Sequence, residues 1–328
     1  PGNDMRFYWE RVEASRNFAN KVWNASRFIL MNMDGKNVTK PEASELMPAD
    51  QWILSACNTL VKDVTENLDK FELGIALSKV YDFVWDEFCD WYIEIAKYRM
   101  YHAEEDPKGA NAALWTLREV LKISLKLLHP YIPFVTEEIY SKLVPEEESL
   151  MMSAWPEYDE ALNFPEAERI VDHYKEIVRG IRNVRAEMNV PNSRKATAYV
   201  VCEDEQLGLG LAMLSNAAQN MAALNKLVLQ KTTEGIAEDA VSIVVPDATV
   251  YVPLEELIDF EQEIERLTKE EERLTKEIAR SNGMLNNEKF VSKAPAAKVQ
   301  EEREKLETYQ QMMAQVKERL EGLKAKQS

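Results

Sequence analysis

The chain has 328 residues, of which 45% are hydrophobic and 30% charged, and its formal net charge is -17 at pH 7. This length predicts two or three folding units rather than one. So acidic a chain is not expected to bind nucleic acid over its whole surface, although a few well-placed basic groups suffice for a local site.

Three cysteines, Cys57, Cys89 and Cys202, each stand within an apolar run. An odd number in this setting predicts buried, reduced thiols, which are typical of a cytoplasmic protein. No run of 18 apolar residues occurs, so no membrane span is expected, and the first residues show no signal-peptide pattern. Because the chain starts with Pro rather than Met, we expect it to be a piece of a longer protein.

The first predicted helix runs from about Met5 to Met33 and has two unlike faces. Phe18, Val22, Ala25 and Ile29 recur at helical spacing and form its apolar face. Its other side is basic and rich in amides, and consists of Arg16, Asn17, Asn20, Lys21, Asn24 and Arg27.

The polar face of this helix is unusual because no Asp or Glu occurs from Ala14 to Met33. Asn is a poor helix former, so its repeated use here has a local cost. Two interpretations stay open. The amides and cations either cap or bridge neighbouring helices, or they face the phosphates and base edges of a nucleic acid.

Further helices are predicted up to residue 145. Pro107 and Gly109 interrupt the apolar pattern between two of them. Successive antiparallel helices with short loops form a helical bundle, which we place at residues 1–145. These helices are expected over about 50–68, 73–101, 114–128 and 133–143.

Asp86, Glu87 and Asp90 form an acidic patch on the helix expected at 73–101. Metal binding is one interpretation, but no His lies nearby in the sequence. We therefore expect these acids to hold basic residues of neighbouring helices by ion pairing. The aromatic residues among them are expected in the core.

Residues 146–165 are predicted to be a linker, and residues 166–253 a small α+β unit. The first helix of that unit carries Arg179, Arg182 and Arg185 at three-residue steps. They lie near one face and either meet phosphate or pair with the unit's own acids. Strands are expected over about 197–202, 226–230, 241–245 and 249–252, and a helix over about 205–223.

Residues 254–328 carry two heptad seams joined by a short loop, which predicts an antiparallel coiled-coil hairpin. Each arm of about 28 residues would be roughly 40 Å long. Glu271 and Ser281 are polar positions in the first seam, and Gly283 is expected to break it. Pro295 suits the first turn of the second arm.

The loop end of this hairpin is basic within an acidic protein, with Glu288 its one acid. This charge is either ordinary solvation of a loop or a tip that contacts an RNA backbone. The basic residues are Arg280, Lys289, Lys293 and Lys298.

No catalytic or metal site can be argued from the sequence. It contains no CxxC pair, no Walker loop and no arguable Ser/His/Asp set. The three histidines are isolated, and His129 stands in an apolar context where a satisfied core role is expected.

Four segments carry a resemblance to a known family: RNFANKVWNASRF, WDEFCDWYIEIAK, LLHPYIPFVTEEIY and FVSKAP. They strongly resemble the valyl-tRNA synthetase family of class I aminoacyl-tRNA synthetases, in which the first segment lies at the start of the anticodon-binding domain. The resemblance spans nearly the whole chain. It implies a mainly α fold with an antiparallel helical bundle of the class I anticodon-binding type, a small α+β unit and a C-terminal antiparallel coiled-coil hairpin.

The resemblance also implies a function. The bundle would receive the anticodon loop, and Arg16, Asn17, Asn20, Lys21, Asn24 and Arg27 match the family's motif. Of these, Asn20, Lys21, Asn24 and Arg27 are the better placed, because one helix cannot turn every side chain toward RNA. The hairpin would lie against the tRNA elbow through Arg280, Lys289, Lys293 and Lys298.

In this family the intact enzyme joins valine to its tRNA with ATP and Mg²⁺. The family's HIGH and KMSKS signatures are missing from this chain, so we expect it to hold no cofactor and to be inactive alone. The expected partners are valine tRNA and the catalytic and editing domains of the same parent chain. We expect a monomer.

Other interpretations stay open. The acidic charge and the long coiled coil also suit a protein-interaction scaffold that docks through the hairpin. The isoleucyl and leucyl enzymes share the bundle architecture, although the hairpin and the first segment favour the valyl type. A self-contained hydrolase is disfavoured because no nucleophile and base can be paired.

Overall fold

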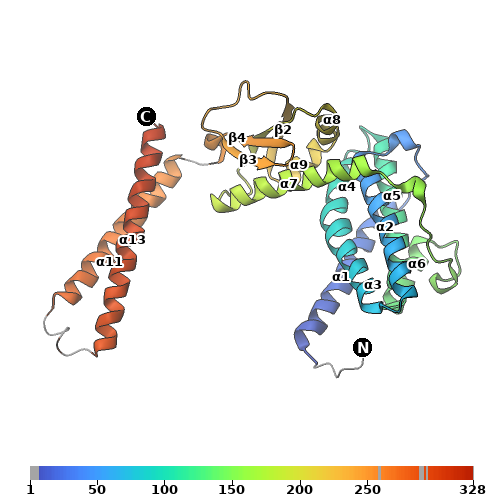
Figure 1. The fold of residues 1–328 in the computed structure, drawn as a ribbon, viewed down its shortest axis with the longest axis horizontal. Helices are drawn as coiled ribbons and strands as arrows, with labels where there is room; N and C mark the ends of the chain where they lie inside the picture. Colours follow the sequence, from blue (N-terminus) through green and yellow to red (C-terminus); the bar gives the residue numbers. More distant parts are fainter. Residues whose placement is uncertain (1–6, 258–259, 288–291, 293–294, 328) are drawn as a thin grey trace. The chain divides into compact units, whose positions relative to one another are not determined.

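The computed structural model describes residues 7–257, 260–287, 292 and 295–327 of the chain (Figure 1). The chain divides into two compact units, Pro1–Pro253 and Leu254–Ser328. None of the helices in the described ranges has the length and hydrophobicity needed to cross a lipid bilayer.

The first part of the first unit is a bundle of helices (Figure 1). The mainly α fold expected from the sequence is therefore confirmed. The bundle elements are α1 (Trp9–Met33), η1 (Ala43–Glu45), α2 (Pro48–Asp69), α3 (Leu73–Asp82), η2 (Phe83–Tyr92), α4 (Ile93–Tyr101), α5 (Pro107–Leu128) and α6 (Pro133–Leu143).

Helix α5 begins earlier than its leucine pattern indicates. The Asp106 side chain accepts a hydrogen bond from the backbone N–H of Gly109 at 2.9 Å, and Pro107 occupies the first helical position. An aspartate cap followed by proline is a favoured helix start. The interruption expected at Pro107 is therefore a helix N-terminus.

A buried polar group stands at the centre of the bundle. Asp50 has no exposed surface and Arg99 is only 7% exposed. Arg99 Nη1 donates to Asp50 Oδ2 at 2.8 Å, and the Tyr92 hydroxyl donates to Asp50 Oδ1 at 2.7 Å. Because the charges pair and the hydroxyl is satisfied, the group can remain dehydrated.

Residues 146–165 are fastened to α2 rather than free of it. Asn58 exchanges two hydrogen bonds with the backbone of Asp159, at 2.8 and 2.9 Å. Trp155 Nε1 donates to Thr65 Oγ1 at 2.9 Å. This stretch includes the short helices η3 (Leu150–Met152) and η4 (Glu160–Leu162).

The rest of the first unit is a four-stranded sheet with helices, as expected for a small α+β unit. The strand order is β2-β1-β4-β3; β1 and β2 are parallel, and the other neighbours are antiparallel. The helix expected over 205–223 is two helices. The elements are α7 (Pro165–Glu187), β1 (Ala196–Val201), α8 (Glu205–Met213), α9 (Ser215–Met221), β2 (Leu224–Gln230), β3 (Val241–Val245) and β4 (Ala248–Val252).

Helix α7 packs on both the bundle and the sheet (Figure 1). Lys175 is buried, pairs with Glu87, and lies 4.2 Å from the centroid of the Trp52 ring. Further along, a Cβ at Gly180 would lie 2.6 Å from Ile243 Cγ2. Only glycine lets α7 approach β3 so closely.

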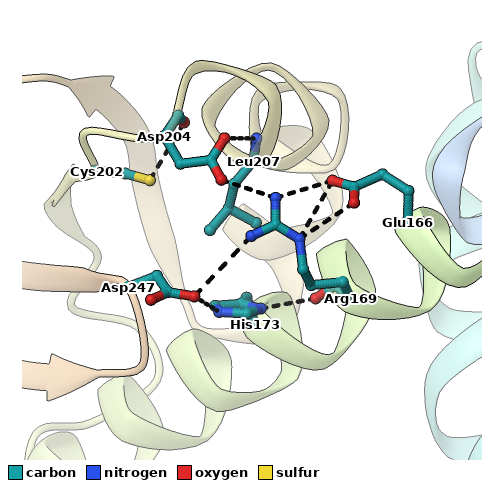
Figure 2. Close-up of polar contacts among 7 residues, drawn as sticks. All are labelled: Glu166, Arg169, His173, Cys202, Asp204, Leu207 and Asp247. Carbon is teal, nitrogen blue, oxygen red and sulfur yellow. Dashed lines mark hydrogen bonds and ion pairs between the residues drawn. The ribbon is translucent and has the colours of Figure 1, made fainter.

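The first half of α7 is also tied to the sheet by ion pairs (Figure 2). Arg169 Nη2 lies 2.9 Å from Glu166 Oε1 and 2.8 Å from Asp204 Oδ2, the side chain that caps α8. His173 Nε2 lies 3.2 Å from Asp247 Oδ2 in the β3–β4 turn. The cluster joins three segments that are far apart in the sequence.

The second unit is an antiparallel hairpin of α11 (Phe260–Leu285) and α13 (Ala296–Gln327), preceded by α10 (Leu254–Leu257). Leu267, Leu274 and Leu320 are buried along the predicted seams. Helix α11 continues through Gly283, so the break expected there is wrong. One glycine costs about 1 kcal/mol in a helix, which packing along the seam can outweigh.

Candidate nucleic-acid interface

The polar face of α1 is exposed over its length. Phe18, Val22 and Ile29 are buried on the opposite side, which fixes the orientation of the helix. No hydrogen bond or ion pair engages the face's five exposed side chains within the described part of the chain. These side chains are Arg16, Asn17, Asn20, Asn24 and Arg27.

The amides of this face therefore do not cap or bridge neighbouring helices, which was one of the two interpretations. They leave donors and acceptors directed to solvent, as the edges of unpaired bases require. The arginines add positive charge, and no Asp or Glu occurs between Ala14 and Met33 to offset it. Such a surface can bind a single-stranded, anionic chain.

Lys21 differs from the other candidates on α1. Its ammonium lies 2.7 Å from Asp90 Oδ1 and 3.8 Å from the centroid of the Trp85 ring. Trp85 in turn stacks with Tyr81, at a centroid distance of 5.7 Å. The charge of Lys21 is therefore already engaged within the bundle, and the side chain fastens α1 to η2.

Trp23 is a residue that the sequence reasoning missed. Its side chain is 45% exposed, three residues after Asn20 and four before Arg27. These spacings place the indole among the amides rather than on the apolar face. An exposed indole between amides and arginines offers a surface on which a base can stack.

The acidic patch of the third predicted helix holds basic residues, as expected. Asp90 pairs with Lys21, and Glu87 pairs with Lys175 of α7. This patch lies on η2, a π-helical segment whose wider turn the sequence periodicity does not predict. Among the residues that the structure describes, no three His, Cys, Asp or Glu side chains are arranged to hold a metal ion.

Cys57, Cys89 and His129 take part in the packing of the bundle, whereas Cys202 is buried directly after β1. Burial raises the pKa of the Cys57 and Cys89 thiols to about 12. Both thiols are therefore protonated near neutral pH and poor nucleophiles. His129 Nδ1 lies 2.9 Å from Thr136 Oγ1, which satisfies that ring nitrogen.

The three arginines that the sequence places at three-residue steps on α7 have unlike partners. Arg179 pairs with Glu176 at 2.9 Å. Arg182 and Arg185 instead donate to backbone carbonyl oxygens, those of Met221 and of the segment after α7. Only the first is thus an ion pair with the unit's own acids.

At the hairpin, two of the four basic candidates fall within the described residues. Arg280 is largely exposed near the end of α11, where its Nη1 lies 3.5 Å from Glu277 Oε2. Lys298 is exposed in the first turn of α13. Lys289 and Lys293 lie outside the described residues.

Two family models match this chain. One, described as the anticodon-binding domain of tRNA ligase, matches residues 50–200. The other, described as the valyl tRNA synthetase tRNA binding arm, matches residues 259–324. The first match covers most of the bundle and reaches β1, whereas α1 precedes it.

Curated relatives match almost the full chain. The valine–tRNA ligase of Clostridium perfringens is 47% identical over 326 residues, which is 98% of this chain and 36% of that enzyme. The enzyme of Clostridium acetobutylicum is 47% identical over 99% of this chain, and that of Listeria innocua 41% over 99%. The chain spans a little over a third of the length of these relatives. The chain therefore belongs to the valyl-tRNA synthetase family and comprises its anticodon-binding domain and its tRNA-binding arm.

Proposed function

We propose that this chain is the tRNA-binding part of a valine–tRNA ligase. The bundle reads the anticodon loop through α1, and the hairpin braces the elbow of the tRNA. The larger enzyme joins valine to that tRNA with ATP and Mg²⁺ at sites outside this chain. The chain's own contribution is binding energy and discrimination between tRNAs.

The observation that carries this proposal is the unengaged polar face of α1. It combines an exposed indole, Trp23, with the amides of Asn20 and Asn24 and the guanidinium groups of Arg16 and Arg27. Bases of a single-stranded loop stack on aromatic rings, and amides can bond to their edges. Arginine forks suit the phosphates between those bases.

The hairpin supports the proposal by a different chemistry. Arg280 and Lys298 are exposed near the end where α11 and α13 are joined, and no described aromatic side chain lies within five residues of either in the sequence. Charges without a stacking surface recognise a phosphate backbone rather than bases. This property suits the folded elbow, whose bases are largely paired.

A binding titration tests the anticodon reading. The full 328-residue chain is titrated with a valine tRNA transcript and with the same transcript carrying a different anticodon. We expect weaker binding of the second transcript. Trp23→Ala should weaken binding of the first by about 1–3 kcal/mol, the usual value of a base stacked on an aromatic ring, and Trp23→Phe should retain most of it.

Arg11→Gln is the matched control for Arg27→Gln. Both change one charge on α1, but Arg11 precedes the acid-free segment and its guanidinium lies over the Tyr8 ring. We expect only Arg27→Gln to weaken binding. Equal affinity for the two transcripts, unchanged in the α1 variants, would contradict the proposal and favour a protein-interaction module.

A further inference from the structure

A basic cleft of about 660 Å³ lies in the first unit, away from α1 in the sequence. It is formed by the C-terminal part of α7, the segment that follows it, and the end of α9. No Asp or Glu is among the described residues that line it. The side chains able to donate hydrogen bonds into it are Arg182, Arg185, Asn192, Lys195, Gln219 and Asn220.

Arg185 is buried in the wall of this cleft without a counter-charge. It is 4% exposed, and its Nη2 donates to the carbonyl oxygens of Pro191 and Arg194 at 3.0 and 2.7 Å. Its Nη1 is buried and has no hydrogen-bond partner among the described residues. Burial also lowers the pKa of this guanidinium from its ordinary value.

The bundle of the same unit shows how a buried arginine is otherwise accommodated. Arg99 is 7% exposed, and its guanidinium is held by both carboxylate oxygens of Asp50. Dehydrating a cation is costly unless it is paired, and arginine does not escape by losing its proton. Arg185 is therefore a buried cation that, unlike Arg99, has no anionic partner among the described residues.

Two further cations border the same cleft. Arg182 donates from Nε to the carbonyl oxygen of Met221 at 2.6 Å, and its Cζ lies 5.9 Å from the centroid of the Trp91 ring. Lys195 is exposed. Within the described residues neither forms an ion pair. Three uncompensated cations thus meet at one cleft in a chain of net charge -17.

We infer that this cleft binds a phosphate group, and that in the tRNA complex it holds a phosphodiester of the RNA backbone. A phosphate supplies the acceptors that Arg185 lacks and neutralises the positive charges of Arg182 and Lys195, which form no ion pair within the described residues. The inference rests on the proposed tRNA binding for its source of phosphate. It adds a contact on the α+β unit to those on α1 and the hairpin.

The salt dependence of tRNA binding tests this contact in the full chain. Each phosphate contact contributes roughly 0.7–0.9 to the slope of log K against log salt concentration. We expect the double variant Arg182→Gln/Lys195→Gln to reduce the slope by about 1–2 and the affinity by about tenfold at moderate salt. Arg179→Gln is the matched control, because it lies one turn earlier on α7, pairs with Glu176 and does not line the cleft.

Inorganic phosphate alone provides the second arm. A ligand that binds only the folded state raises the melting temperature. We expect phosphate to raise the Tm of the chain above that in chloride at equal ionic strength, and Arg185→Met to abolish this rise. Arg185→Met removes a buried unpaired charge but also two hydrogen bonds to backbone carbonyl oxygens. The phosphate effect on Tm is therefore also measured in Arg182→Gln/Lys195→Gln, where we expect it to be smaller than in the unchanged chain.

The outcomes separate this inference from the proposed function. An unchanged salt slope in the double variant, together with an equal phosphate effect on Tm in all variants, would show that the cleft does not bind phosphate. If Trp23→Ala still weakens tRNA binding in that case, the proposed function stands without it. If Arg185→Met abolishes the phosphate effect on Tm while Arg182→Gln/Lys195→Gln leaves tRNA binding unchanged, the cleft binds a free phosphate compound instead of RNA.

Discussion

Lys21 Nζ lies 2.7 Å from Asp90 Oδ1, across 69 residues of sequence, and 3.8 Å above the Trp85 ring. This contact divides the polar residues of α1 by role. Lys21 fastens the helix to η2, whereas the neighbouring amides and arginines are left to solvent. The two roles make different predictions for variants of the same helix.

Replacing Lys21 should affect stability more than tRNA binding. Lys21→Met removes a partly exposed ion pair and a cation–π contact, which together contribute about 1 kcal/mol to the free energy of unfolding. We expect its effect on tRNA affinity to be smaller than that of Arg27→Gln. Chemical denaturation and tRNA titration of both variants measure the two effects.

A double-mutant cycle identifies the partner. If the pair acts as described, Asp90→Asn adds little further destabilisation once Lys21 is already Met. Additive losses from the two changes would contradict the contact. If Lys21→Met lowers tRNA affinity more than Arg27→Gln does, Lys21 contacts the tRNA and is not only a structural residue.

The polar face of α1 could be predicted because its pattern is contained in one stretch of sequence. Amides and arginines that recur without acids are visible without knowing any contact. The pairing of Lys21 could not be predicted, since Asp90 is distant in the chain. The exposure of Trp23 was missed for a related reason: its neighbours Val22 and Ala25 suggest a core position, although its spacing from Asn20 does not.

The cleft on the α+β unit could not be predicted from the sequence for a different reason. The arginines at three-residue steps are evident in the sequence, and both phosphate contact and ion pairing are compatible with that spacing. Only the structure separates Arg179, which has an acidic neighbour, from Arg185, which is buried and has no acid within reach among the described residues. Whether a charge is paired depends on residues that are distant in the sequence and close in the fold. The periodicity that predicts helices depends only on neighbouring residues in the sequence.

The stability of the first unit should fall in acid through Asp204. The N–H of Leu207 and the guanidinium of Arg169 lower the pKa of Asp204 below its ordinary value of 3.8. The folded state therefore favours the ionised carboxylate. Its contribution is fully present above pH 3.8 and is lost as the pH falls through the lowered pKa.

Asp204→Asn tests this pH dependence. The variant removes the charge but retains an oxygen that can cap α8. We expect its Tm to lie below that of the unchanged chain near neutral pH and the difference to shrink below pH about 4. A Tm difference that stays constant down to pH about 2 would contradict the assigned pKa shift.

The hairpin contains a buried polar pair that should set its register. Ser281 Oγ donates to Glu302 Oε1 at 2.6 Å between α11 and α13, and the two residues are 2% and 9% exposed. Ser281→Ala leaves a buried carboxylate without its donor, which should lower the free energy of unfolding by about 1–3 kcal/mol.

Replacing both partners should reverse that loss. Ser281→Ala/Glu302→Leu makes the seam apolar at both positions, and we expect it to be at least as stable as the unchanged hairpin. Thermal unfolding of the single and double variants provides the comparison. A double variant less stable than the unchanged hairpin would show that the pair contributes net stability and not register alone.

Neutralising the basic end of the hairpin should flatten the salt dependence of tRNA binding without changing its anticodon preference. Arg280→Gln/Lys298→Gln removes two charges that face solvent near the junction of α11 and α13. If each meets one phosphate, the slope of log K against log salt falls by about 1.4–1.8. Lys305→Gln is the control, because Lys305 lies on α13 and is paired with Glu301 at 2.6 Å.

The affinity ratio between the valine transcript and its anticodon-swapped form should be the same in the unchanged chain, the double variant and the control, since backbone charges carry no sequence information. A changed ratio would mean that the hairpin contributes to discrimination, and an unchanged slope would leave it a structural arm.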